Sequence, residues 1–200
     1  MKSFETSIAS YSVITDESEI DVSSIPPQFR RRLSPLQKIY FSLAAKLQAE
    51  RYDYAVFSSE FGEDSLTRRL VADFNDGIGI SPQRFSTSVY NAAPGLWSVF
   101  AKEHNAYTAI AAGEDSIECA LIEALSHRGK VLCVHAEEAP EQFIGESIIF
   151  DSSADAAGRS IAVCDGDAGN HPMEVSALRD FLAAEAKFLS GRFISLKYCE

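Results

Sequence analysis

Apolar and polar residues alternate along this chain with two different periods. Between residues 34 and 47 the apolar positions recur every three or four residues, which is typical of a helix with one buried face. These positions are Leu36, Ile39, Tyr40, Leu43, Ala44 and Leu47. Ser34 and Gln37 have the spacing of a capping box, and Pro35 suits the first helical turn. We therefore predict a helix that begins after Ser34.

The same reading predicts alternating helices and strands over the rest of the chain. Helical periodicity appears at 63–74, with Leu66, Leu70 and Val71 facing inward, and at 91–101, 114–126 and 174–189. Strands are predicted at 4–14, 52–59, 84–89, 105–110, 130–136, 147–150, 159–165 and 192–198. Segment 130–136 is almost continuously apolar, as in a strand covered on both faces. The order of elements predicts an α/β fold with a mostly parallel or mixed sheet covered by helices.

Composition narrows the class of protein. The 200 residues, 46% of them apolar, predict a single domain over 1–200. A net charge of −11 argues against nucleic acid as a partner. The four cysteines and four histidines show no metal-binding spacing, and no glycine-rich phosphate motif follows a strand, so we expect no metal and no cofactor. The N-terminus does not read as a signal peptide, which predicts a cytoplasmic protein.

Two clusters of polar residues are candidates for chemistry. Arg30, Arg31 and Arg32 form a basic run, either as an ion-paired loop or as a contact for phosphate or an acidic partner. The segment HAEEAPE (135–141) places His135 with Glu137, Glu138 and Glu141 at the end of a predicted strand. Sites of α/β proteins often lie there, and an exposed acidic loop is the alternative.

The segment SVYNAAPGLWSVFAKEHNAYTAIAAGEDS (88–116) resembles the central segment of β-ketoacyl synthases of the thiolase fold. Asn91 and Gly95 match the Asn-x-x-x-Gly helix of that family. The turn Thr-Ala-Cys-x-x-Gly that carries its nucleophile is matched at 108–113, with Ile110 in place of the cysteine. FSSEFGED (57–64) is similar to the strand-end loop of the family, with Phe61 at the acyl-pocket position. The resemblance covers about residues 25–165, the expected core, and implies half of a thiolase-like fold.

RRRLSPLQKI and RFSTSVYNAAPG are closer still to the short chain-length-factor-like homologues from bacterial aryl polyene clusters. The side chain of isoleucine has no lone pair and no ionisable proton, so it cannot replace a thiolate nucleophile. The catalytic histidines of the family lie in its second half, which has no counterpart here. The resemblance therefore implies a non-catalytic chain-length factor that forms a heterodimer with an active ketosynthase, whose acyl chain is held on an acyl carrier protein.

The resemblance also implies where the partner and the acyl tunnel lie. In the family, the two sheets meet edge to edge through the strand that precedes the Asn-x-x-x-Gly helix, which predicts an interface strand at 84–90. The interface or tunnel positions are then Phe61, Phe85, Ser88, Tyr90 and Asn91. An alternative function is a stand-alone enzyme with an acid–base site near His135, Glu137 and Glu138.

Overall fold

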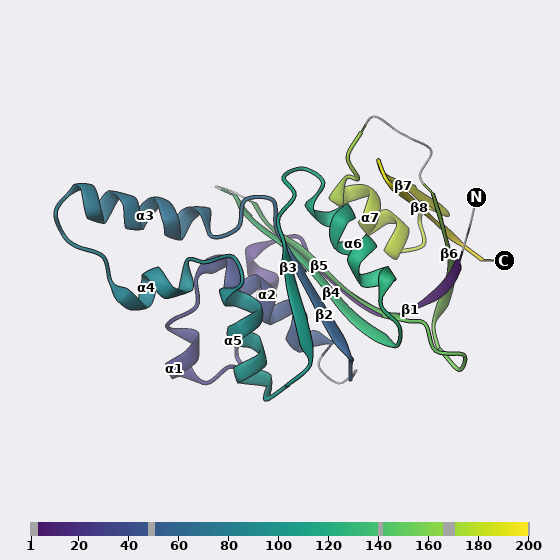
Figure 1. The fold of residues 1–200 in the computed structure, drawn as a ribbon, viewed down its shortest axis with the longest axis horizontal. Coiled ribbons are helices and arrows are strands. Elements are labelled where there is room, and N and C mark those ends of the chain that lie inside the picture. The colour runs from purple at the N-terminus through teal and green to yellow at the C-terminus, as the bar shows by residue number, and fades with distance from the viewer. Residues whose placement is uncertain (1–3, 48–50, 140–141, 166–170, 200) are drawn as a thin grey trace.

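The protein is built on one mixed sheet of eight strands, as the computed structural model shows for residues 4–47, 51–139, 142–165 and 171–199 (Figure 1). The strands are β1 (Phe4–Ile14), β2 (Tyr54–Ser58), β3 (Ala106–Ile110), β4 (Lys130–Ala139), β5 (Gln142–Asp151), β6 (Arg159–Asp165), β7 (Phe188–Ser190) and β8 (Ile194–Tyr198). Their order in space is β3-β2-β4-β5-β1-β6-β8-β7. Strand β2 pairs in parallel with β3 and β4, and the remaining pairs are antiparallel.

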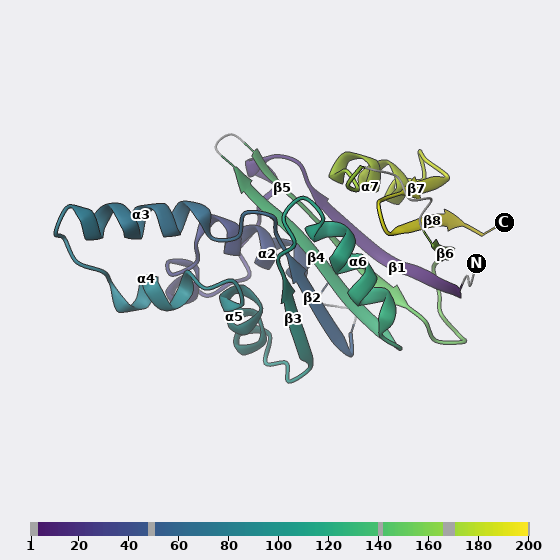
Figure 2. The same ribbon diagram turned by 45° about the horizontal axis from the view of Figure 1, so that its top comes forward.

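Helices cover both faces of this sheet (Figure 2). They are α1 (Pro27–Arg30), α2 (Pro35–Lys46), α3 (Asp64–Asn75), α4 (Pro82–Thr87), α5 (Ala92–Ala101), α6 (Ser116–Ser126) and α7 (Val175–Leu182), with a short 3-10 turn at Glu17–Glu19. Helices α2 and α5 pack on Leu132 and Val134, whereas α6 and α7 pack on the face that carries Val131 and Cys133. Strand β4 is therefore buried on both sides, which confirms the prediction for 130–136.

The helix predicted after Ser34 is confirmed in detail. The Ser34 hydroxyl accepts a hydrogen bond from the backbone N–H of Gln37 at 3.0 Å, and the Gln37 side chain accepts one from the N–H of Ser34 at 3.2 Å. All six apolar positions predicted to face inward are buried. Two local signals, the cap and the periodicity, agree here with the tertiary packing, so the helix forms where the sequence predicts it.

Helices α3 and α4 form an arm that extends away from the sheet (Figure 1). The prediction of a helix at 63–74 is confirmed, but only part of its apolar face is covered. Leu70 is 5% exposed, whereas Val71 is 55% exposed and Phe74 is 65% exposed. The inward position predicted for Val71 is therefore wrong, because α3 extends away from the sheet and packs against the short helix α4 without covering Val71.

Two predicted elements differ from the structure. Residues 84–89 were expected to be extended, but Pro82–Thr87 is helix α4, which the Ser81 hydroxyl caps. The helix predicted at 174–189 ends at Leu182, and Ala184 adopts a left-handed φ of 62°. The chain then returns as the β7–β8 hairpin, which extends the sheet beyond β6. The antiparallel pairing of β7 with β8 takes precedence over the helical periodicity of this segment.

Candidate functional site

The candidate site lies at the carboxyl ends of the parallel strands. Ile110 is the last residue of the edge strand β3, and the chain turns through Gly113 before α6 begins at Ser116. Gly113 has a φ of 59°, a left-handed conformation in which side chains other than glycine are strained. The Ser116 hydroxyl accepts a hydrogen bond from the N–H of Ala112 at 2.9 Å and so closes the turn. The predicted strand–turn–helix around Ile110 is confirmed.

Ile110 is half-buried and packs against the hydrophobic core formed by α6 and α7. Its side chain offers no group that could attack a carbonyl or transfer a proton. The backbone carbonyl of Ile110 accepts a hydrogen bond from the hydroxyl of Tyr90. The same hydroxyl also contacts the carbonyl of Ser59 and accepts a hydrogen bond from its N–H at 2.6 Å. Tyr90 therefore ties the turn after β3 to the loop after β2.

The Asn-x-x-x-Gly segment forms helix α5, as predicted. Asn91 precedes its first turn without a capping hydrogen bond from its side chain. A Cβ atom at Gly95 would lie 3.3 Å from the hydroxyl of Tyr107 in β3, so glycine allows α5 to approach the edge strand closely. The residue thus has a packing role within this chain.

The predicted interface or tunnel residues lie in and beside the arm. Phe61 follows β2 and is 58% exposed, and Phe85 lies on α4 and is 60% exposed. Ser88 and Tyr90 are half-buried between α4 and α5. Because 82–87 is helical, the prediction of an interface strand at 84–90 is wrong. The strand beside α5 at the edge of the sheet is β3 instead.

A buried polar row runs across the sheet next to Ile110. Strand register places Ile110 beside Ser58, Ser58 beside His135, and His135 beside Glu146. The Ser58 hydroxyl lies 3.0 Å from Nδ1 of His135, and the guanidinium of Arg179 lies 2.7 Å from Glu146. Burial lowers the pKa of His135 to about 4, so its ring is neutral at pH 7. Burial raises the pKa of Glu146 to about 7, and the hydrogen bond and charge of Arg179 oppose this shift.

Glu137 holds the loop after β2 from the same face of the sheet. Its carboxylate accepts hydrogen bonds from the hydroxyl of Ser59 at 2.8 Å and from the backbone N–H groups of Glu60 and Phe61. Burial raises its pKa, and these hydrogen bonds oppose the shift. The carboxylate therefore satisfies N–H groups at the foot of the arm, which is a structural role.

The acid–base site proposed for His135, Glu137 and Glu138 is brought together only in part. Nε2 of His135 lies 3.5 Å from the carboxylate of Glu137, whereas Glu138 lies elsewhere. His135 and Glu137 are 4% and 7% exposed and face α6 and α7, so a substrate does not reach them. Glu138 points to the opposite face of β4, where it accepts a hydrogen bond from the hydroxyl of Ser65 at 2.9 Å. The region is not an exposed acidic loop either, because β4 continues to Ala139. Glu141, the fourth member of the cluster, lies outside the described residues.

Neither a metal centre nor a bilayer-spanning helix is found in the described ranges. No group of three or more histidine, cysteine or acidic residues is placed there to hold a metal ion. No helix there has the length and apolar composition needed to cross a bilayer. Cys119, Cys133, Cys164 and Cys199 are free thiols.

A further buried carboxylate, Glu63, predicts a pH dependence of stability. One oxygen accepts hydrogen bonds from Ser34 at 2.9 Å and Gln37 at 2.7 Å, and the other has no partner within the described residues. Burial raises the pKa of Glu63 from 4.5 to about 7, so the folded state binds its proton more tightly than the unfolded state. The contribution of Glu63 to the free energy of unfolding therefore falls as the pH rises from about 4.5 to 7.

We expect Glu63→Gln to reduce this loss, because an amide is neutral at every pH. Urea denaturation of the wild-type chain and the variant at pH 5 and pH 7.5 measures the change in the free energy of unfolding between the two pH values. The variant retains a part of the pH dependence from Glu146, whose pKa is also raised. An unchanged difference between the two pH values would contradict the assignment to Glu63.

Comparison with known proteins identifies the family. Residues 6–165 match the model of the β-ketoacyl synthase N-terminal domain, and because this is most of the chain, the protein belongs to that family. The fold is similar to a chain in the structure of a ketosynthase (ApeO) in complex with its chain length factor (ApeC) from Xenorhabdus doucetiae. That match has a TM-score of 0.74 and 21% identity, and it covers 98% of this chain and 100% of that chain.

A second similar structure contains a type II PKS acyl-carrier protein in complex with its ketosynthase bound to the hexaketide (AntDE:AntF). The TM-score is 0.59 at 10% identity, over 74% of this chain. This chain spans 62% of the matched chain in that structure. No curated protein sequence matches. At these identities the two structures establish the ketosynthase-like α/β fold and nothing finer.

Proposed function

We propose that this protein is a non-catalytic chain-length factor that forms a heterodimer with an active β-ketoacyl-acyl carrier protein synthase. The observation that carries the proposal is Ile110, which occupies the turn where the family presents its nucleophile. The turn and its glycine are present, and the Tyr90 hydroxyl holds the carbonyl of Ile110, but the side chain at this position is a hydrocarbon with no reactive atom. Condensation would then take place on the partner, which supplies the cysteine and histidines.

The match to a structure of a ketosynthase with its chain length factor supports this partnership, because it covers 98% of this chain and 100% of the matched chain. The resemblance of RRRLSPLQKI and RFSTSVYNAAPG to one branch supports aryl polyene biosynthesis as the setting, in the bacterial cytoplasm. The acyl chain would reach the complex on an acyl carrier protein bound through the ketosynthase. No cofactor is needed for such a role.

The edge strand β3 is the first surface that we assign to the partner. It is the outermost strand on its side of the described sheet, so its outer N–H and C=O groups have no strand to pair with. Ala106 and Tyr107 are exposed on it, Tyr107 to 40%. Strand β3 takes the place of the interface strand that the sequence wrongly indicated at 84–90. Pairing with the equivalent edge of the ketosynthase would continue one sheet through both subunits.

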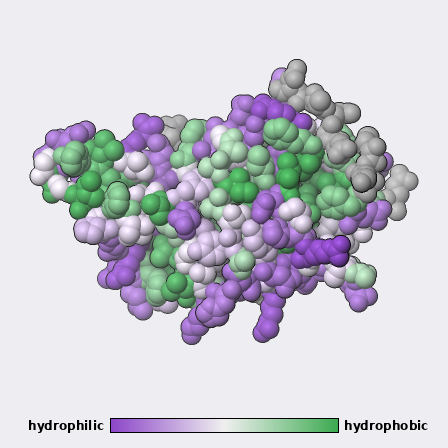
Figure 3. Space-filling view, viewed as in Figure 1, coloured by the Kyte–Doolittle hydropathy of each residue, from purple (hydrophilic) through white to green (hydrophobic). Residues whose placement is uncertain are grey.

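The arm is the second surface. A cleft of about 270 Å³ between α3 and α4 is lined by Thr67, Leu70, Val71, Phe74, Ile80, Phe85 and Ser88. Figure 3 shows hydrophobic residues gathered on the arm. Exposed apolar patches of this kind mark interaction sites on soluble proteins. We infer that the ketosynthase covers the arm, and that Phe61, Phe85, Ser88, Tyr90 and Asn91 lie at or near the end of its acyl tunnel.

Coexpression of this chain with a candidate ketosynthase partner tests the proposal. We expect the two chains to elute together from a size-exclusion column, and condensing activity to require the complex. The chain alone should not condense malonyl and acyl groups on a carrier protein. Ile110→Cys serves as the control, and it should remain inactive alone because a thiol without the family's histidines cannot drive decarboxylation. Separate elution of two independently active proteins would refute the partnership.

A further inference from the structure

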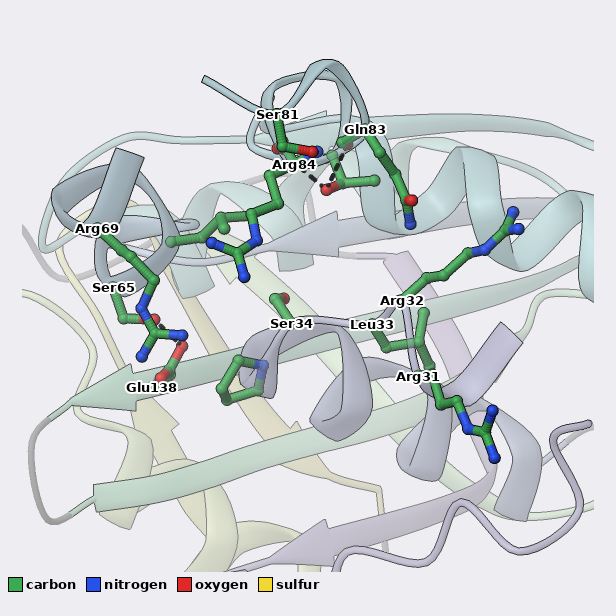
Figure 4. Close-up of a pocket in the computed structure, with 13 residues that line it drawn as sticks. Arg31, Arg32, Leu33, Ser34, Ser65, Arg69, Ser81, Gln83, Arg84 and Glu138 are labelled. Carbon is green, nitrogen blue, oxygen red and sulfur yellow. Dashed lines mark hydrogen bonds between the residues drawn. The ribbon is translucent and has the colours of Figure 1, made fainter. Parts of the chain in front are cut away.

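A second pocket lies on the opposite side of the arm from the apolar cleft. It has a volume of about 460 Å³ and lies where the loop after α1, the start of α2 and the two arm helices meet (Figure 4). Its lining is Arg31, Arg32, Leu33, Ser34, Pro35, Ser65, Leu66, Arg69, Ser81, Gln83, Arg84, Thr87 and Glu138. We call it the arginine pocket. Pockets for small ligands span about 300–1,000 Å³, so this one has room for a compact ligand.

The charge of the arginine pocket is opposite to that of the whole chain. Four arginines and one glutamate line it, which is 4 − 1 = +3, in a protein with a net charge of −11. The basic run at residues 30–32 supplies two of these arginines, Arg31 and Arg32. Arg69 from α3 and Arg84 from α4 join them through the folding of the arm. Because arginines from three separate segments line one pocket of an acidic protein, the electrostatic potential in this pocket is locally positive.

These charges are only partly neutralised. The side chains of Arg31 and Arg32 form no hydrogen bond or ion pair with another described residue, and both are exposed. One nitrogen of Arg84 forms an ion pair with Asp73, with a long hydrogen bond of 3.4 Å. Arg69 lies near Glu138, whose carboxylate is also hydrogen bonded by Ser65. Guanidinium N–H groups therefore remain available to a ligand.

The arrangement of the side chains favours an anion inside the pocket. Figure 4 shows Arg84 pointing from α4 into the pocket and Arg69 beside Ser65 and Glu138, whereas the guanidinium of Arg32 is directed away from both. The amide of Gln83 also lies at the rim. Guanidinium groups bind phosphoryl oxygens through paired hydrogen bonds, and several of them match a ligand that carries more than one negative charge. A single carboxylate would leave most of this positive charge uncompensated.

We propose that the arginine pocket binds a small phosphate ester carrying two phosphoryl groups, held between Arg69 and Arg84. The site is separate from Ile110 and from the apolar cleft, and it does not depend on the proposed partnership with a ketosynthase. A ligand here would link the loop before α2 to both helices of the arm. It would hold the arm in one orientation relative to the sheet.

Isothermal titration of the full-length chain with pyrophosphate at constant ionic strength tests the proposal. We expect saturable binding at one site that weakens as salt is raised. Arg69→Gln and Arg84→Gln should each weaken binding about tenfold or more, since each removes charge-assisted hydrogen bonds to the anion. Arg68→Gln is the matched control, because Arg68 is the neighbour of Arg69 on α3, its side chain is 79% exposed, and it does not line the pocket. The affinity of Arg68→Gln for pyrophosphate should stay within about twofold of the wild type.

Three results would overturn the assignment. The first is the absence of saturable binding of pyrophosphate. The second is an equal loss of affinity in Arg68→Gln and Arg69→Gln, which would show a diffuse effect of charge. The third is equal competition by malonate, which would show that any dianion binds and not a phosphoryl group. The exposed positions of Arg69 and Arg84 leave folding intact, and circular dichroism of each variant checks this.

Discussion

The double substitution Phe74→Asp and Phe85→Asp is expected to abolish the complex with the ketosynthase. The two rings are 65% and 60% exposed on the arm and line the same apolar cleft. If the partner buries them, each aspartate removes an aromatic contact and places a charge in an apolar contact. We expect the affinity to fall by about 100-fold or more, measured by copurification and by titration of the purified subunits.

Phe188→Asp is the matched control for the arm. Phe188 is 53% exposed, but it lies on β7, at the sheet edge opposite β3. The affinity of this variant should equal that of the wild type. All three positions are exposed in the isolated chain, so thermal unfolding of the subunit alone should hardly change. A double variant that binds the ketosynthase at full affinity would exclude the arm as a docking surface.

A second large effect is expected at Glu118, which joins α6 to the end of the chain. The residue is fully buried. Its carboxylate accepts hydrogen bonds from the backbone N–H groups of Phe193, of Ile194 at 2.8 Å, and of Arg192 at 2.9 Å. Glu118→Ala leaves these donors without an acceptor, which we expect to lower the free energy of unfolding by about 3–5 kcal/mol. Urea denaturation measures the change.

Two further variants distinguish the loss of this buried contact from the loss of any acidic side chain near Arg192. Glu118→Gln keeps one carbonyl oxygen and should lose less stability than Glu118→Ala. Glu114→Ala removes the exposed partner of the Arg192 guanidinium, which lies 3.0 Å away, and should cost less than about 1 kcal/mol. Equal losses in Glu114→Ala and Glu118→Ala would contradict the role of the buried carboxylate.

The elements that could be predicted were those in which local signals and packing agree. Helix α2 combines a capping box with a regular apolar face, and β4 is continuously apolar because both of its faces are covered. Helix α6 places Ile117, Leu121 and Ala124 in the core at the predicted spacing. In each case the residues that form the element also form its contacts.

Helix α4 was missed although a signal for it was present. Ser81 and Pro82 repeat the Ser-Pro start that was recognised at Ser34 and Pro35, and the Ser81 hydroxyl does cap the helix. Phe85, Thr87 and Val89, which are residue types enriched in strands, instead favoured a strand. Phe85 is exposed in the isolated chain, so this apolar residue belongs to a surface patch and does not mark a buried strand.

The sequence by itself determined the family resemblance, the strand–turn–helix around Ile110 and the absence of a nucleophile there. These follow from residue types at fixed spacing, which local chemistry sets. Only the tertiary structure placed the Tyr90 hydroxyl on the carbonyl of Ile110, separated Glu138 from His135, and gathered Arg69 and Arg84 in one pocket. Such contacts join residues that are distant in the chain. They depend on how the sheet and the arm pack, which no local pattern records.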